Sequence, residues 1–202
     1  MSNERTAGTI ILVASIGFIL ALNMAEFIYG PGYSVSLNTI SDLGATCVAG
    51  VCTIPKSALF FDGSVFLKGL ATVVASYYLY RAFKRRTFSG FLVLSGVGAM
   101  GVGLFPENYG LVHSDFTFVT FFFGVLSVFA AFPIEKRPLN YLSVVLGLIS
   151  LASLVVILQP ELFNYLGIGK GGVERMIAYP LLLWGTALGG QLIATNPKTL
   201  PG

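Results

Sequence analysis

A single histidine and a few carboxylates are the side chains in this sequence that could transfer protons. His113 is the only histidine, and an imidazole changes its protonation state near neutral pH, which suits it to general acid–base chemistry. Asp42, Asp62 and Asp115 could orient that imidazole or bind a substrate. We therefore take His113, Asp62, Asp115 and Asp42 as candidate catalytic residues, while a structural histidine at the start of a helix is an equal alternative.

Two basic side chains could hold an anionic group. Arg175 could bind a phosphate or carboxylate through two parallel hydrogen bonds, but it could also anchor a helix at the membrane surface or pair with Glu174. Lys68 lies within an apolar segment, and we expect it to pair with an acid on another helix, either Glu26 or Asp115. The candidate substrate-binding residues are Ser41, Asn38, Glu26, Lys68, Glu107 and Arg175.

The two cysteines favour a disulfide over a metal site. Cys47 and Cys52 are separated by four residues in one loop, and a disulfide can form outside the cytoplasm; two free thiols or a redox pair are the alternatives. Two cysteines and one distant histidine make a poor zinc site. Residues 169–172 are rich in glycine but lack the Lys-Ser/Thr ending of a phosphate-binding loop. We predict no metal and no cofactor.

The composition indicates that membrane-spanning helices position these residues. Of the 202 residues, 55% are hydrophobic and 10% are charged, and the mean hydropathy is +0.82, whereas a soluble domain usually carries about 25% charged residues. This excludes a cytosolic enzyme, a nucleic-acid-binding module and a disordered chain. A helix crosses a bilayer with about 20 apolar residues, and six stretches qualify: residues 7–27, 57–80, 88–105, 112–132, 139–158 and 174–195.

The sequence therefore predicts an all-α polytopic membrane bundle that forms one domain over residues 1–202. We expect the first stretch to be a retained span rather than a cleaved signal peptide. With the N-terminus inside, eight of the 12 Lys and Arg residues lie on the inner side, three lie on the outer side, and Lys68 lies within a span. Such a bias marks cytoplasmic loops, so both termini are predicted in the cytoplasm, with the protein in the cell membrane.

The long outer loop, residues 28–56, is expected to cover one end of the bundle. Leu37, Ile40 and Leu43 recur every three residues before Gly44, which predicts a short helix on or partly within the outer membrane face. Most acidic residues also lie on the outer side or in the outer halves of spans, and Glu161 and Glu174 are expected simply to be solvated there. We expect the loop and the spans to enclose a polar cavity that opens outward.

Two segments resemble a known membrane family. Residues 38–45, Asn-Thr-Ile-Ser-Asp-Leu-Gly-Ala, and residues 103–107, Gly-Leu-Phe-Pro-Glu, followed by His113, are similar to a prokaryotic family catalogued as domain of unknown function 998. The resemblance covers about residues 8–195. It implies a six-helix membrane domain with no established reaction, and it draws attention to Ser41, Asp42, Pro106, Glu107 and His113.

A more distant similarity is to membrane hydrolases of the alkaline ceramidase and adiponectin-receptor type. Those enzymes use Ser, Asp and three His around zinc within a helical bundle. A single histidine cannot supply that site, so zinc-dependent amide hydrolysis is not predicted.

Three functions fit these observations. The first is an enzyme or binding protein that acts on a lipid or isoprenoid-linked substrate at the outer leaflet. The second is a small proton- or cation-coupled transporter, in which Asp62, Lys68, Glu26 and Asp115 would form a relay. The third is a non-catalytic assembly protein. Membrane lipids are the expected partners and nucleic acid is not; Gly185 and Gly189 favour packing within the chain, with a homo-oligomer contact as the alternative.

Overall fold

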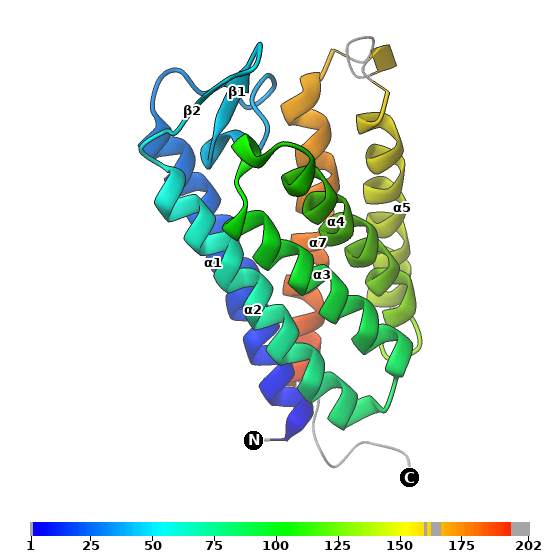
Figure 1. The fold of residues 1–202 in the computed structure, drawn as a ribbon. Helices are drawn as coiled ribbons and strands as arrows, with labels where there is room; N and C mark the ends of the chain where they lie inside the picture. The colour runs from blue at the N-terminus through cyan, green and yellow to red at the C-terminus, as the bar shows by residue number, and fades with distance from the viewer. Residues whose placement is uncertain (1, 160, 163–166, 195–202) are drawn as a thin grey trace.

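Six long apolar helices form the molecule, seen here in a computed structural model that describes residues 2–159, 161–162 and 167–194 (Figure 1). Each is long and apolar enough to cross a membrane. They are α1 (Asn3–Tyr29), α2 (Ala58–Phe83), α3 (Arg86–Leu104), α4 (Leu111–Ala131), α5 (Leu139–Ile157) and α7 (Gly169–Ala194). The predicted all-α polytopic bundle is confirmed. The largest difference in a boundary is in α7, which begins at Gly169 rather than near residue 174.

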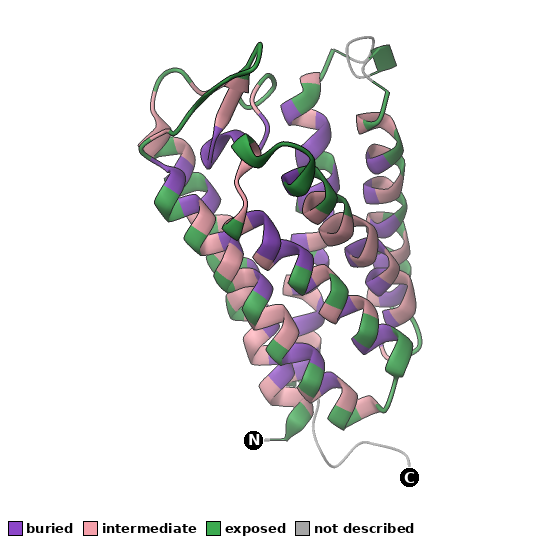
Figure 2. Ribbon diagram, viewed as in Figure 1, coloured by how far each residue is buried: buried purple, intermediate pink, exposed green. Residues whose placement is uncertain are grey.

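The helices form a closed ring in chain order. Each packs against the next one along the chain, and α1 completes the ring by packing against α7. Helices that follow each other along the chain run in opposite directions. As a result, α1 begins at the end of the bundle where α7, the last helix, finishes (Figure 1). Buried and exposed positions alternate along each helix (Figure 2). The exposed positions include many large apolar residues, which a bilayer would cover.

Small residues let α1 and α7 approach closely. A Cβ added at Gly189 would lie only 2.8 Å from the Gly8 carbonyl oxygen and the Leu12 amide nitrogen, and one added at Gly185 would lie 2.6 Å from Ser15 Oγ. Packing within the chain therefore uses both glycines of the predicted small-residue motif. A homo-oligomer contact through the same two positions would have to displace α1.

A small hairpin and an irregular loop cover one end of the ring, which we call the hairpin end. Strands β1 (Thr46–Val48) and β2 (Val51–Thr53) are antiparallel, and Cys47 lies directly opposite Cys52. The predicted disulfide joins these two cysteines. Ala49 and Gly50 both have positive φ, at 50° and 82°, as a two-residue turn of this kind requires.

The predicted helix over residues 36–44 is wrong, since this stretch holds only a single 3₁₀ turn, η1 (Ser41–Leu43). Asp42 Oδ2 accepts the Thr39 amide at 2.8 Å, and Thr39 Oγ1 accepts the Asp42 amide at 3.1 Å. Short polar side chains that bond nearby amides compete with helical hydrogen bonds. As a result, Ile40 and Leu43 are buried in the bundle while Leu37 is 73% exposed.

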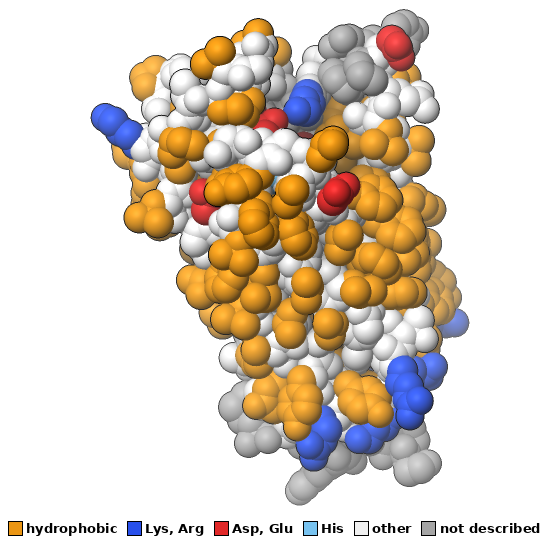
Figure 3. Space-filling view, in the orientation of Figure 1, with side chains coloured by type: hydrophobic (Ala, Val, Ile, Leu, Met, Phe, Trp, Pro, Cys, Tyr) orange, Lys and Arg blue, Asp and Glu red, His pale blue; other side chains and the backbone are white. Residues whose placement is uncertain are grey.

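The two ends of the bundle differ in charge. On the face shown in Figure 3, basic side chains gather at the end opposite the hairpin, whereas acidic side chains lie in the half nearer the hairpin. The basic residues of that opposite end come from the end of α2 and the start of α3, at residues 81–86, from residues 136–137 between α4 and α5, and from Arg5 at the start of α1. The positive-inside expectation would place this end in the cytoplasm.

Candidate functional site

Three polar side chains from distant parts of the chain meet beneath the hairpin end. Ser41 Oγ of η1 lies 3.0 Å from His113 Nε2 of α4 and 3.3 Å from Glu174 Oε1 of α7. All three residues are buried. We call them the Ser–His–Glu cluster. Two of its members were predicted as site residues, and the third, Glu174, was expected to be solvated, which is wrong.

The histidine is oriented by a backbone carbonyl. His113 Nδ1 lies 2.8 Å from the carbonyl oxygen of Phe105, at the end of α3. A carbonyl oxygen only accepts hydrogen bonds, so Nδ1 carries a hydrogen and Nε2 of the neutral ring is an acceptor facing Ser41. Glu107–Tyr109 forms a 3₁₀ turn (η2), and Gly110, with φ of +60°, lets the chain turn directly into α4. His113 therefore enters the bundle two residues after α4 begins.

Glu174 holds the loop to the last helix. Its Oε2 accepts the Ile40 amide at 2.5 Å, next to the contact of Oε1 with Ser41. One carboxylate thus binds both the backbone and the side chain at the start of η1. The sequence signal for Glu174 was its place within an apolar helix, where a charged group is costly unless it has a partner.

Arg175 is a structural latch rather than an open anion site. Its guanidinium donates to the carbonyl oxygens of Val35, Asn38 and Gly171, each at 3.0 Å. It also forms an ion pair with Glu26 at 2.8 Å, and it donates to the Tyr33 hydroxyl. This places two predicted substrate-binding residues, Arg175 and Glu26, in a contact between α1, the loop and α7.

The first turns of α7 explain why the loop can approach so closely. A Cβ added at Gly169 would overlap with the Ser36 carbonyl, and one added at Gly171 would overlap with the Asn38 carbonyl. The Gly171 amide donates to the Ser36 carbonyl at 2.9 Å. The glycine-rich segment therefore packs under the loop. Burial among these groups raises the pKa of the Tyr33 hydroxyl, which donates to the Thr39 carbonyl at 2.8 Å.

Two cavities lie next to the Ser–His–Glu cluster. The first, about 130 Å³, is mainly apolar and extends inside the ring towards Lys68 and Trp184; we call it the apolar cavity. The second, about 170 Å³, is lined by His113, Glu107, Lys170 and apolar residues of α4 and α5; we call it the polar cavity. The two cavities share four of their lining residues, namely Ser41, Thr117, Phe121 and Glu174.

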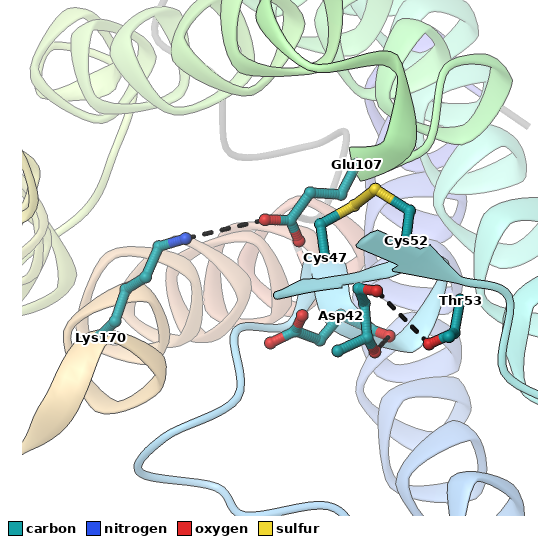
Figure 4. Close-up of a disulfide and its surroundings, with 7 residues drawn as sticks. Asp42, Cys47, Cys52, Thr53, Glu107 and Lys170 are labelled. Carbon is teal, nitrogen blue, oxygen red and sulfur yellow. Dashed lines mark hydrogen bonds and ion pairs between the residues drawn. A yellow bond between two sulfur atoms is a disulfide. The ribbon is translucent and has the colours of Figure 1, made fainter. Parts of the chain in front are cut away.

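An ion pair lies at the polar cavity. Lys170 Nζ is 3.7 Å from Glu107 Oε1, and Figure 4 shows the two side chains facing each other, with Glu107 beside the disulfide. Burial raises the pKa of Glu107, and the nearby ammonium of Lys170 partly offsets that effect. Lys170 is the more exposed partner, so it is available to a ligand that enters this cavity.

The remaining predicted catalytic acids lie outside the cluster. Asp42 uses Oδ2 to accept from the Thr39 amide and from Asn38 Nδ2, so both Asp42 and Asn38 stabilise the loop. Asp115 is exposed, because a residue two positions after His113 points to another side of the helix. Asp62 packs against Gly44 and lines neither cavity. The expectation that one site contains all four catalytic candidates is therefore wrong.

Lys68 does not pair with an acid among the described residues. Its ammonium donates to Thr72 Oγ1 at 3.0 Å, one turn along the same helix. Glu26 is held by Arg175 and Asp115 is exposed, so the expected pairing with either of them is wrong. Lys68 instead lines the apolar cavity.

A second buried carboxylate lies at the opposite end of the bundle. Glu135, in the connection between α4 and α5, accepts the Trp184 indole N–H at 2.7 Å. Burial raises the pKa of this carboxyl. Glu135 was not a predicted site residue. It lies far from Glu174, because its partner Trp184 comes ten positions, about 15 Å of helix, after Glu174 along α7. In the described ranges, no group of three or more His, Cys, Asp or Glu side chains could hold a metal.

Comparison with known proteins identifies the family. No curated protein and no solved structure matches the chain, so the more distant similarity to ceramidase-type hydrolases is not shown. One family model, described as protein of unknown function (DUF998), matches residues 12–191. That range includes all six helices in whole or in large part, together with the Ser–His–Glu cluster. The chain therefore belongs to the DUF998 family.

Proposed function

We propose that this protein binds an amphipathic lipid from the outer leaflet and that the Ser–His–Glu cluster contacts the polar part of that lipid. The observation that carries the proposal is that Ser41 and Glu174 of the cluster line both cavities, while His113 lines the polar one. An amphipathic ligand needs polar partners next to a largely apolar volume. Only a short apolar portion of the ligand would fit the apolar cavity of about 130 Å³, and the polar part would lie towards Lys170.

The wall of the polar cavity supports entry from the membrane. Phe118 of α4 and Leu158, which follows α5, line this cavity and are also exposed on the outside of the bundle. A lipid could therefore reach His113 between α4 and α5 without passing through the hairpin. If the basic end faces the cytoplasm, as the positive-inside bias predicts, this entry lies in the outer leaflet.

The cluster also favours acid–base chemistry on the bound molecule. Ser41 Oγ is within hydrogen-bond reach of a base, His113, which is oriented by a third group, the Phe105 carbonyl. This is the arrangement that activates a hydroxyl for proton transfer or attack. We therefore favour an enzyme that acts on a lipid over a passive assembly protein.

No observation favours the transporter alternative. Its relay would link Asp62, Lys68, Glu26 and Asp115, but Glu26 pairs with Arg175 and Asp115 is exposed. Within the part of the chain that the structure describes, the Lys68 ammonium donates to Thr72 Oγ1 of its own helix and forms no ion pair with an acid. The four groups therefore do not form a connected path.

Lipid binding can be tested by native mass spectrometry of the delipidated protein. We expect a one-to-one adduct with dioleoyl phosphatidylglycerol or dioleoyl phosphatidylcholine in the wild type. Thr117→Trp, which places a large side chain at a position that lines both cavities, should lower adduct formation at least tenfold. Val112→Trp, at an exposed position of the same helix, should not.

A second variant protects the test against misfolding. If Thr117→Trp does not purify as a folded protein, Ala178→Leu fills the apolar cavity from α7 and should weaken binding in the same way. Wild-type binding in a variant with a filled cavity would refute the proposal.

A further inference from the structure

The Ser–His–Glu cluster has one hydroxyl hydrogen for two acceptors. Ser41 Oγ faces His113 Nε2 on one side and Glu174 Oε1 on the other. When Glu174 is ionised and His113 is neutral, both of these groups can only accept from Ser41, because His113 Nδ1–H is directed at Phe105. One of the two contacts would then bring lone pairs together inside a buried site, which is unfavourable.

One additional proton satisfies every contact, and it can do so in two ways. In the first arrangement, protonated Glu174 donates to Ser41, and Ser41 donates to neutral His113. In the second, doubly protonated His113 donates to Ser41, and Ser41 donates to ionised Glu174. The two arrangements contain the same atoms and the same net charge. They differ only in that one O–H bond of Glu174 has been replaced by an N–H bond of His113.

We propose that Glu174, Ser41 and His113 form a relay that holds one transferable proton, and that an anionic headgroup beside Lys170 draws this proton onto His113. The hydroxyl of Ser41 passes the proton by accepting from one neighbour and donating to the other. The second half of the proposal rests on the proposed lipid binding and assigns an anionic headgroup to the ligand.

The charges around the cluster determine which arrangement is preferred. Moving the proton from Glu174 to His113 creates two charges in a buried site, which is costly without compensation. Without an anion beside His113, this cost favours the first arrangement. The positive charges of Arg175 and Lys170 favour an ionised Glu174, whereas that of Lys170 disfavours a charged His113. Glu107 and Asp42 are the acids on the loop side.

An anion in the polar cavity supplies the missing compensation. It would place negative charge beside the imidazole, which lines that cavity, while the new carboxylate of Glu174 stays close to Arg175. The anion would also offset the positive charge of Lys170, which otherwise disfavours an imidazolium at His113. The relay thus matches the charge of the site to the ligand without taking a proton from solution.

Two spectroscopic readouts count the proton directly at pH 7. His113 is the only histidine, so selective ¹⁵N-histidine labelling reports on one imidazole. The infrared band of a protonated carboxyl that is lost in Glu174→Gln reports on Glu174. In nanodiscs of phosphatidylcholine, we expect a protonated Glu174 with a neutral imidazole whose hydrogen is on Nδ1. An ionised Glu174 with a neutral imidazole, or a protonated Glu174 with an imidazolium, would overturn the one-proton relay.

The second arm adds phosphatidylglycerol to the nanodiscs. We expect the carboxyl band to decrease and the imidazolium signals to increase together in the wild type. Ser41→Ala should abolish this linked response, whereas Ser127→Ala, at a buried serine of α4 that donates to the Phe123 carbonyl, should respond as the wild type does. A response in Ser41→Ala equal to that of the wild type would overturn the role of Ser41.

The two proposals fail in different ways. If mass spectrometry shows that phosphatidylglycerol binds but the proton stays on Glu174, the coupling to an anionic headgroup is refuted while lipid binding stands. If neither lipid binds, the proposed function and the coupling are refuted, while the proton count in phosphatidylcholine still decides whether the relay exists.

Discussion

Arg175 is expected to be the most important single side chain for the structure of the outer loop. Arg175→Met removes donors to three carbonyls, to Tyr33 and to Glu26. Removing one partner of a buried ion pair typically costs about 3–5 kcal/mol. We expect a loss of that order in the free energy of unfolding, rather than the sum over five hydrogen bonds, because such contributions are not additive.

The assay combines denaturant unfolding in detergent with limited proteolysis of the loop. Arg175→Met should expose residues 31–38 to cleavage, and Arg175→Lys should recover only part of the loss, because three donors on a flexible stem cannot replace the planar fork of arginine. Arg86→Met, at an exposed arginine, is the control and should stay within about 0.5 kcal/mol of the wild type. A loss of less than about 1 kcal/mol in the free energy of unfolding, with a loop that resists proteolysis, would refute the role of Arg175 in holding the loop.

Three further predictions follow from packing and charge. Gly171→Ala should lower the free energy of unfolding by about 1–3 kcal/mol and release the loop, because the added Cβ would overlap with the Asn38 carbonyl. Gly190→Ala is the control: nothing lies within 4 Å of its added Cβ, so it should be neutral or stabilising by up to about 1 kcal/mol. Equal effects of the two substitutions in denaturant unfolding would contradict the close approach of the loop to Gly171. Lys68→Met should raise the free energy of unfolding by up to about 3 kcal/mol, since it removes an ammonium within a span that donates to the Thr72 hydroxyl and has no acidic partner among the described residues. A clear loss of stability would contradict this expectation. Because burial raises the pKa of Glu135 in the folded protein, the wild type should lose stability as pH rises above the ordinary pKa of that carboxyl. The difference in thermal midpoint between Glu135→Gln and the wild type should therefore grow with pH. Glu161→Gln, at an exposed glutamate, should show no such trend. A difference that does not depend on pH would contradict the raised pKa of Glu135.

The sequence alone was sufficient to predict the six long helices. The length of each apolar stretch predicts a helix that can cross the bilayer, since no other continuous structure satisfies its backbone hydrogen bonds there. The helix predicted over residues 36–44 fails because Asn38, Thr39 and Asp42 bond the local backbone instead. Periodicity of apolar residues could not reveal that competition.

The composition of the candidate site was only partly predictable. Ser41 and His113 were found from their residue types and from the family resemblance, but Glu174 was placed in solvent, and Asp115 and Asp62 were placed in the site. Membrane helices are apolar on nearly all sides, so the sequence does not reveal which face of a span points inward. The relative rotation of α4 and α7, which brings His113 and Glu174 to one serine, is therefore not readable from the pattern.

The sequence by itself determined that this chain forms six apolar helices long enough to cross a membrane, because the bilayer constrains length and polarity locally. Only the tertiary structure decided that Ser41 meets His113, 72 residues away, and Glu174, 133 residues away. Those contacts depend on how the loop packs against glycines at the start of α7 and on the closure of the ring by α1. The packing of the loop and the closure of the ring both join segments that are distant along the chain, so no local pattern of residues predicts them.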